Sequence, residues 1–392
     1  MSDFRSLLTS FQAATGTSQD GGKKSNKTPN IPVGRTLKEN IRDLWRRSQI
    51  QKSIGQGSST YKSDTKDSNL KTIAPIHIAV CATIVSTLPH ETIWRSWMDH
   101  HDTDLATASM HVHAKTPSSI EKDSWLKSVC LSVSHNPNWN DIRVVKAMLS
   151  LIHSALKDNR TTHIMFVTES CIPVSTIDEL ANYLREEGIS GDRCCCSFLD
   201  AYGRDSARCT RFDEHACFKV QDIPEDAIYK ALPGWCLISK DHAERIVNLP
   251  SQLGKDLYPL FGKIWAPEEV FFPTALSLLG ILPGSEVVNK SIMWAKWDER
   301  SRGQERAHPI EYDGEFDKSL VDDVRREGCL FMRKFRRSIP IRSWESIVYS
   351  SAPKSSANFN NQQGKKRTRD KVENSEEMKT SSQVNRYRNS VH

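Results

Sequence analysis

The sequence predicts an α/β protein with a mostly parallel central sheet that helices flank on both faces. From residue 73 onward, short β-branched apolar segments alternate with segments whose apolar residues recur at helical spacing. Strands separated by helices are typical of parallel sheets. Ligands of such sheets bind beyond the carboxyl ends of the strands, so these ends are where a functional site is expected.

Six segments have the composition of strands. Residues 76–84 are β-branched and bounded by prolines, and residues 163–170 form a continuous apolar run typical of a buried strand. The remaining four are residues 108–114, 128–133, 194–200 and 235–239.

Six further segments have helical periodicity. Asn140 or Asp141 can cap the strongest of them, and Thr176 and Glu179 have the spacing of a capping box. The predicted helices are residues 36–50, 91–101, 139–158, 175–188, 240–249 and a segment that begins at Pro267 and ends before Gly280.

The last of these helices begins with two adjacent acids, in the stretch WAPEEVFFPT (265–274). Pro267 suits the first helical position, which puts Glu268 and Glu269 in the first turn. A carboxylate there interacts favourably with the helix dipole, by roughly 0.3–1 kcal/mol. These two glutamates can therefore be structural, catalytic or both.

The chain of 392 residues divides into three predicted regions. Residues 1–72 are polar and largely disordered with a short amphipathic helix, residues 73–350 form the folded domain, and residues 351–392 form a disordered basic tail. Residues 1–70 hold 12 Lys and Arg against 6 Asp and Glu. Basic excess at the ends of a chain argues against a nucleic-acid-binding fold. The segment GKKRTRD (364–370) is interpreted as part of a solvated, disordered end of the chain, with a localisation signal or a nucleic-acid-binding patch as the alternative.

Several common motifs are absent from the sequence. It contains no G-x-G-x-x-G, no P-loop, no G-x-S-x-G and no cysteine pair with the spacing of a zinc site. Its D-x-D triplet at 102–104 precedes a predicted strand, where a turn is a better interpretation than a metal site. We therefore expect no metal site. No run of 18 apolar residues indicates a transmembrane anchor.

Five motifs then occur in a fixed order. They are HVHAK (111–115), HIMFVTESCIP (163–173), LPGWCLISKDHAERIV (232–247), WAPEEVFFPTAL (265–276) and GCLFMRKF (328–335). With these motifs, residues 76–336 resemble the core-2/I-branching glycosyltransferases, including their plant-type relatives. The resemblance implies a variant of the GT-A fold for the catalytic domain. It also implies inverting, metal-independent transfer of a sugar, most simply N-acetylglucosamine, from a UDP-sugar to a glycan or glycoprotein hydroxyl.

The resemblance also assigns roles to individual residues. An inverting reaction needs a base for the acceptor hydroxyl, and without a metal it needs fixed cations for the departing diphosphate. Glu269 corresponds to the catalytic base, and Arg333 and Lys334 to the diphosphate-binding cations. His113 and Lys115 fall on the nucleotide side. The acceptor or sugar side comprises Glu169, Ser170, Trp235 and Glu268.

Departures from the family pattern leave alternatives open. Val270 stands where the family commonly has His, Lys240 replaces an Arg, and LPGW (232–235) replaces G-S-x-W. UDP-xylose or UDP-glucuronate are alternative donors, and a catalytically silent carbohydrate- or nucleotide-binding protein is an alternative function. The family is typically anchored in the Golgi membrane, but this sequence shows no anchor, so we assign no compartment.

Overall fold

The computed structural model confirms the α/β fold. The central sheet has the strand order β11-β7-β10-β3-β1-β2, with β1 parallel to both β2 and β3. β10 is antiparallel to β3 and β7, because the chain enters β10 from the edge at which β1, β2 and β3 end. The six strands are β1 Ile76–Ile84, β2 Ala106–Ala114, β3 His163–Thr168, β7 Ser197–Phe198, β10 Leu237–Ser239 and β11 Val287–Val288.

The structure describes ten stretches of the chain. The D-x-D triplet, Cys195, Cys209, Cys217, residues 232–234 and the basic tail lie outside them. The described stretches are residues 35–55, 75–101, 106–187, 189–190, 193–194, 196–206, 218–231, 235–297, 309–312 and 316–350.

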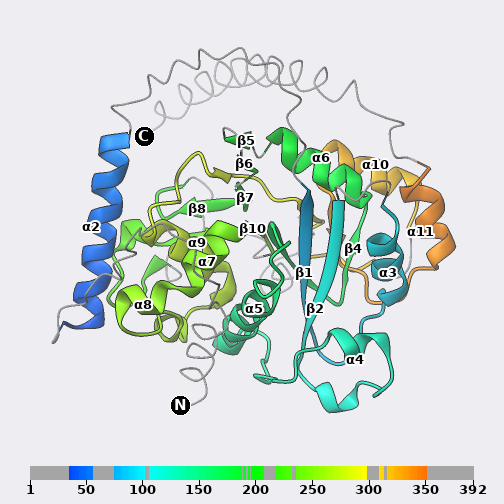
Figure 1. Ribbon diagram of the computed structural model, residues 1–392, viewed down its shortest axis with the longest axis horizontal. Coiled ribbons are helices and arrows are strands. Elements are labelled where there is room, and N and C mark those ends of the chain that lie inside the picture. Colours follow the sequence, from blue (N-terminus) through cyan, green and yellow to red (C-terminus); the bar gives the residue numbers. More distant parts are fainter. Residues whose placement is uncertain are drawn as a thin grey trace, which may run out of the picture.

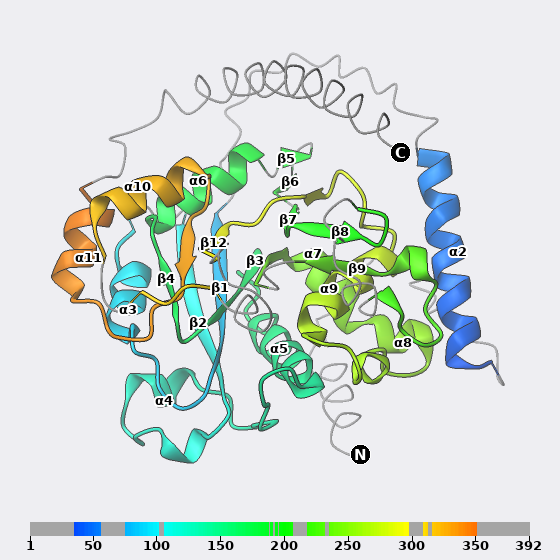
Figure 2. The ribbon, with the colours of Figure 1, turned by 180° about the vertical axis from the view of Figure 1, so that it is seen from behind.

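Helices cover both faces of the sheet (Figures 1 and 2). Alternate residues of β1 pack into two different cores: Ala79 and Cys81 into one, Ile78 and Val80 into the other. The first core is covered by α5 Ile142–Ala155, α7 Lys240–Val247, α8 Leu249–Leu253 and α9 Pro267–Leu278. The second is covered by α3 Glu91–Asp99, α6 Ile177–Glu187, α10 Lys318–Arg326 and α11 Ile341–Val348.

Smaller elements complete the described chain. A three-stranded sheet joins β12 Met293–Ala295, β13 Phe331–Arg333 and β4 Cys171–Pro173. Two strand pairs are β8 Ala201–Gly203 with β9 Tyr229–Ala231, and β5 Ile189–Ser190 with β6 Arg193–Cys194. The 3-10 helices span Pro117–Ser119, Glu225–Ala227 and Tyr258–Phe261.

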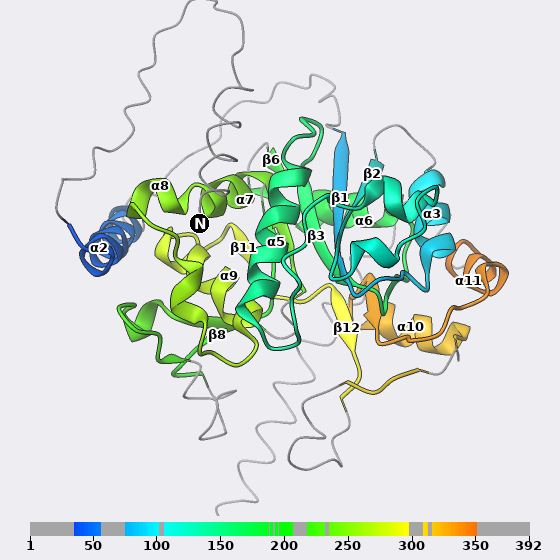
Figure 3. The same ribbon diagram turned by 90° about the horizontal axis from the view of Figure 1, so that it is seen from below.

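The N-terminal helix α2, Leu37–Gly55, packs against α8 and α9 (Figure 3). The Asn40 side chain donates to the Leu253 carbonyl at 3.0 Å, and Lys52 donates to the Leu282 carbonyl at 3.0 Å. Ile41 is fully buried in the first core. The predicted amphipathic helix is therefore present, and it extends five residues beyond the predicted end.

The predicted strand at 128–133 is wrong. Residues 125–129 form the short helix α4, Trp125–Val129, because the Ser124 hydroxyl caps it by accepting from the Lys127 N–H at 3.2 Å. Only Cys130 of this segment pairs with the sheet, through a single bridge to Val112. The predicted strand at 194–200 is shorter, because only Ser197 and Phe198 join the central sheet.

Candidate active site

The three parallel strands end at one edge of the sheet. Their register aligns Thr83 of β1 with His113 of β2 and with Thr168 of β3. Glu169 follows Thr168 directly, and Lys115 follows β2. The sequence thus places polar residues from two strands at the edge where parallel sheets bind ligands.

Trp235 reaches the same edge from the opposite chain direction. The N–H of Phe166 donates to the Cys236 carbonyl at 3.1 Å, so Trp235 lies just before the point where β10 joins β3. Arg333 comes from β13, where it pairs with Cys171 of β4. Its guanidinium lies 5.6 Å from the centroid of a Trp235 ring, which is a cation–π contact.

The first turn of α9 brings Glu268 and Glu269 to this site. Pro267 occupies the first helical turn as predicted, and Ala266 before it has a positive φ of 47°. The side chain of Asn140 accepts from the Ala266 N–H, which joins the starts of α5 and α9. Asp141, the other candidate, caps α5 by accepting from the Arg143 N–H at 2.9 Å.

Lys230 is a site residue that the sequence analysis missed. Its Nζ lies 3.4 Å from Oε2 of Glu269, and its side chain is only 9% exposed. Thr274 of α9 holds β9 in place by hydrogen bonds with both backbone groups of Tyr229, each 3.2 Å long. A lysine within the apolar segment AIYKAL (227–232) is a signal that could have been used, because a buried lysine needs an acidic partner.

The site combines three largely buried acids with two cations. Burial, and secondly the neighbouring Glu269, raises the pKa of Glu268 to about 7. Burial also raises the pKa of Glu269, while Lys230 and Arg333 oppose that rise. The pKa of Glu169 is likewise raised by burial and opposed by Arg333. Such a site can hold one carboxylate ionised beside Lys230 and a second carboxyl protonated as a hydrogen-bond donor.

Glu268 has an unused oxygen. Among the described residues, none makes a hydrogen bond to its buried Oε2. A buried polar atom without a partner is costly in an apolar site, so this oxygen is available to a ligand.

Lys334 lies beside Arg333 but binds another acid. Its Nζ contacts Glu311 at 2.8 Å, and Arg336 contacts the second oxygen of the same carboxylate at 2.7 Å. Lys334 nevertheless acts on the pKa of Glu169, lowering it. The basic segment is therefore close enough to the acids to contribute to their electrostatics.

His113 and Lys115 contact the loop between α4 and α5 rather than the acids. The His113 Nε2 accepts from the His135 N–H at 3.0 Å, and Lys115 donates to the Asn138 side chain at 2.6 Å. Burial lowers the pKa of His113 to about 4, so the ring is neutral. Ser170 is buried, and its hydroxyl lies 3.1 Å from that of Thr168, in the turn beside Glu169.

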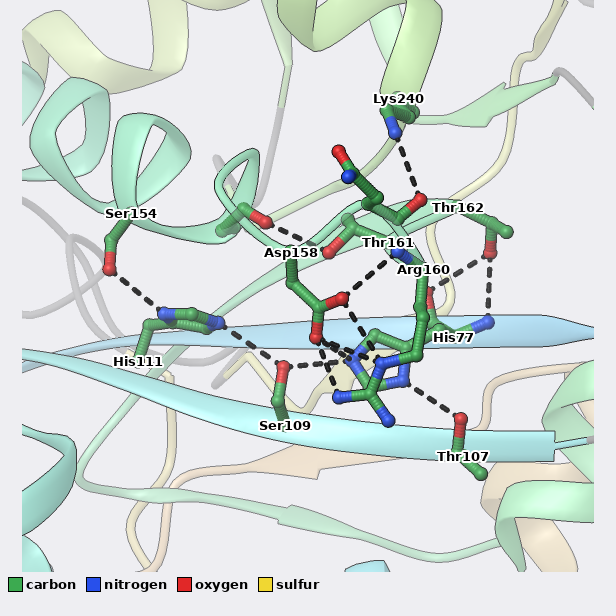
Figure 4. Close-up of polar contacts among 12 residues, drawn as sticks. His77, Thr107, Ser109, His111, Ser154, Asp158, Arg160, Thr161, Thr162 and Lys240 are labelled. Carbon is green, nitrogen blue, oxygen red and sulfur yellow. Dashed lines mark hydrogen bonds and ion pairs between the residues drawn. The ribbon is translucent and has the colours of Figure 1, made fainter. Parts of the chain in front are cut away.

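A second polar cluster lies at the opposite edge of the sheet (Figure 4). His77 contacts the hydroxyls of Thr107 and Ser109 at 2.8 and 3.0 Å, and Ser109 in turn contacts His111 at 3.2 Å. Burial lowers the pKa of both histidines. Lys240 lies at this edge too, where it donates to the Asn159 carbonyl at 3.1 Å. Lys240, which replaces an arginine of the family pattern, is thus remote from the acids.

Neither a metal cluster nor a membrane span appears in the described stretches. No three His, Cys, Asp or Glu side chains gather there as a metal site requires. No helix of those stretches is both long and apolar enough to cross a bilayer.

Comparison with known proteins identifies the family. Residues 80–324 match the model of the Core-2/I-Branching enzyme family. The chain is similar to a protein named Glycosyltransferase BC10 from Oryza sativa subsp. japonica, with 21% identity over 252 residues. The match covers 52% of this chain and 59% of that relative, so the chain spans about three fifths of the relative's length. The α/β architecture agrees with the GT-A-like fold that the resemblance implies, and the chain belongs to the Core-2/I-branching enzyme family.

Proposed function

We propose that this protein is an inverting glycosyltransferase that moves a sugar, most simply N-acetylglucosamine, from a UDP-sugar to a hydroxyl of a glycan or glycoprotein. The observation that carries the proposal is the largely buried Glu269, set at the start of α9 and paired with Lys230 at 3.4 Å. An ionised carboxylate there can take the proton of the acceptor hydroxyl as the hydroxyl oxygen attacks the anomeric carbon.

The leaving UDP gathers negative charge, and we propose that Arg333 and Lys334 stabilise it without a divalent metal. Arg333 stacks on Trp235 and, within the described part of the chain, forms no ion pair with either glutamate of α9, although it acts to lower the pKa of both. Lys334 shares Glu311 with Arg336, so Arg336 can neutralise that acid when Lys334 turns to the diphosphate.

We propose that the departure at Val270 leaves the enzyme active. Its side chain is fully buried in the first core, so a valine in place of histidine alters the packing of α9. Glu268, with its raised pKa and unused oxygen, is suited to donate a hydrogen bond to a sugar hydroxyl.

The test is UDP release from UDP-N-acetylglucosamine, UDP-xylose and UDP-glucuronate with mixed glycan acceptors, in the presence of EDTA. We expect release by the wild type from one donor, and a loss of about 100-fold or more in Glu269→Gln, the usual contribution of a general base. Release that requires a divalent metal would contradict metal independence. UDP binding without turnover on any donor would favour the catalytically silent alternative.

A further inference from the structure

Two tryptophans before the starts of α5 and α9 form an exposed aromatic pair. Trp139 is 64% exposed and Trp265 is 51% exposed. Their ring centroids are 4.7 Å apart and the rings are perpendicular, at 88°. Single exposed apolar residues are ordinary on a protein surface, but two large indoles in mutual contact form an apolar patch that water covers poorly.

The pair is held in place by the backbone of the site. Trp139 precedes Asn140, which has a positive φ of 61° and accepts from the Ala266 N–H. Trp265 precedes Ala266, whose φ is also positive. Positive φ values at non-glycine residues persist only where surrounding contacts fix them. A hydrogen bond from the Ala266 N–H to the Asn140 side chain therefore joins the two backbone segments that carry the indoles.

The same short segment connects the pair to the candidate base. The Ala266 carbonyl accepts from the Glu269 N–H at 2.9 Å, in the first turn of α9. Trp265 thus lies four residues before Glu269 in the sequence and at the same helix end. Trp265 and the candidate base therefore belong to the same helix start, to which Asn140, next to Trp139, is hydrogen-bonded.

The chemistry of the Trp139–Trp265 pair and its neighbours fits a saccharide. A pyranose ring has an apolar face of C–H bonds and a rim of hydroxyls, and an indole face beside polar side chains matches both. Asn138 and Asn140 flank Trp139 in the sequence. Their side-chain oxygens accept from Lys115 and from the Ala266 N–H, and an asparagine amide also carries N–H donors that suit sugar hydroxyls.

We propose that Trp139 and Trp265 form an acceptor platform, on which a sugar unit of the acceptor glycan stacks while its hydroxyl meets Glu269. This inference rests on the proposed function. The diphosphate-binding candidates Arg333 and Lys334 come from a different element, the end of β13 and the residue after it, whereas Lys115 donates to Asn138 beside Trp139, so the KM for the donor is measured together with the KM for the acceptor.

The experiment compares Trp139→Ala, Trp265→Ala and the corresponding Phe variants with the wild type in the full chain. Three quantities are measured: the KM for a soluble oligosaccharide acceptor, the KM for the donor, and UDP release without acceptor. We expect each Ala variant to raise the acceptor KM about tenfold, the effect of losing one stacked sugar face, with the other two quantities unchanged. The Phe variants should restore most of the affinity.

Val133→Ala is the matched control, because Val133 is 56% exposed in the same loop and makes no part of the pair. An unchanged acceptor KM in both Ala variants, or an equal loss in all three quantities, would overturn the platform. If the wild type releases no UDP at all, the proposed function fails instead. The platform is then tested by the quenching of tryptophan fluorescence with the same oligosaccharides. If the oligosaccharides quench the wild type no more than the Trp139→Ala and Trp265→Ala variants, the platform is overturned.

Discussion

Lys230→Met tests whether a buried cation controls the charge of Glu269. Their side chains are 9% and 18% exposed, and Nζ lies 3.4 Å from Oε2. With an effective dielectric constant of about 20, the attraction at that distance is about 5 kcal/mol. Removing one partner of a buried pair typically costs about 3–5 kcal/mol, because the remaining charge is left unpaired. Glu269 can avoid part of this cost by binding a proton, since burial already raises its pKa.

We therefore expect two effects of Lys230→Met. The acidic limb of the pH profile of kcat should move to higher pH, because the base stays protonated further toward neutrality. The free energy of unfolding at pH 7 should fall by about 3 kcal/mol or less. Profiles of UDP release between pH 5 and 9, together with urea unfolding curves, measure both.

Lys318→Met provides the control for the loss of one ion pair. Lys318 contacts Asp322 at 2.8 Å, but the two side chains are 61% and 42% exposed. An exposed pair of this kind contributes about 0.3–0.5 kcal/mol, so neither effect should appear. A folded Lys230→Met variant whose acidic limb coincides with that of the wild type would refute the role of the pair.

Two further predictions concern stability and pH. Because the pKa of Glu268 is raised, its stabilising contribution is complete below about pH 4.5 and is lost as the pH rises through about 7. Glu268→Gln should therefore be up to about 3 kcal/mol more stable than the wild type at pH 8, but no more stable at pH 4. Urea unfolding at both pH values measures this difference, and a difference of the same size at the two pH values would contradict the prediction. Burial lowers the pKa of His113 and His163 to about 4, so their contribution is complete above pH 6.5 and is lost as pH falls toward 4. His113→Gln, which keeps an acceptor for the His135 N–H, should lose less stability between pH 7 and 4.5 than the wild type in thermal unfolding, and an equal loss would exclude His113 as a cause.

Local sequence signals predicted most of the fold. Residues 76–84 match β1 in full, because their apolar β-branched run begins directly after Pro75, and Pro89 follows soon after its end. The capping box of α6 is also present, with Glu179 accepting from the Thr176 N–H at 2.7 Å. The prediction of a strand at 128–133 was wrong, because Ser124, four residues upstream, caps a helical turn there. The apolar content of the segment alone did not distinguish this turn from a strand.

The site was predictable only where its geometry is local or where motif order indicated it. Glu268 and Glu269 follow from one helix start. The meeting of Arg333 with Trp235 depends on pairing between β13 and β4, which no local spacing could supply. The resemblance to the family assigned both residues to the site but did not predict their contact. Lys230 reaches Glu269 through the packing of β9 on α9, a contact between segments about forty residues apart that is invisible to any local pattern.

The docking of α2 has a consequence for the synthesis of this chain. Its hydrogen bonds from Asn40 and Lys52 reach residues that follow them by 213 and 230 positions. Ile41 and the rest of its apolar face must therefore stay exposed on the ribosome until α8, α9 and Leu282 have emerged. During that interval α2 is a surface that a chaperone can bind, and its burial marks the completion of the helical layer that carries Glu268 and Glu269.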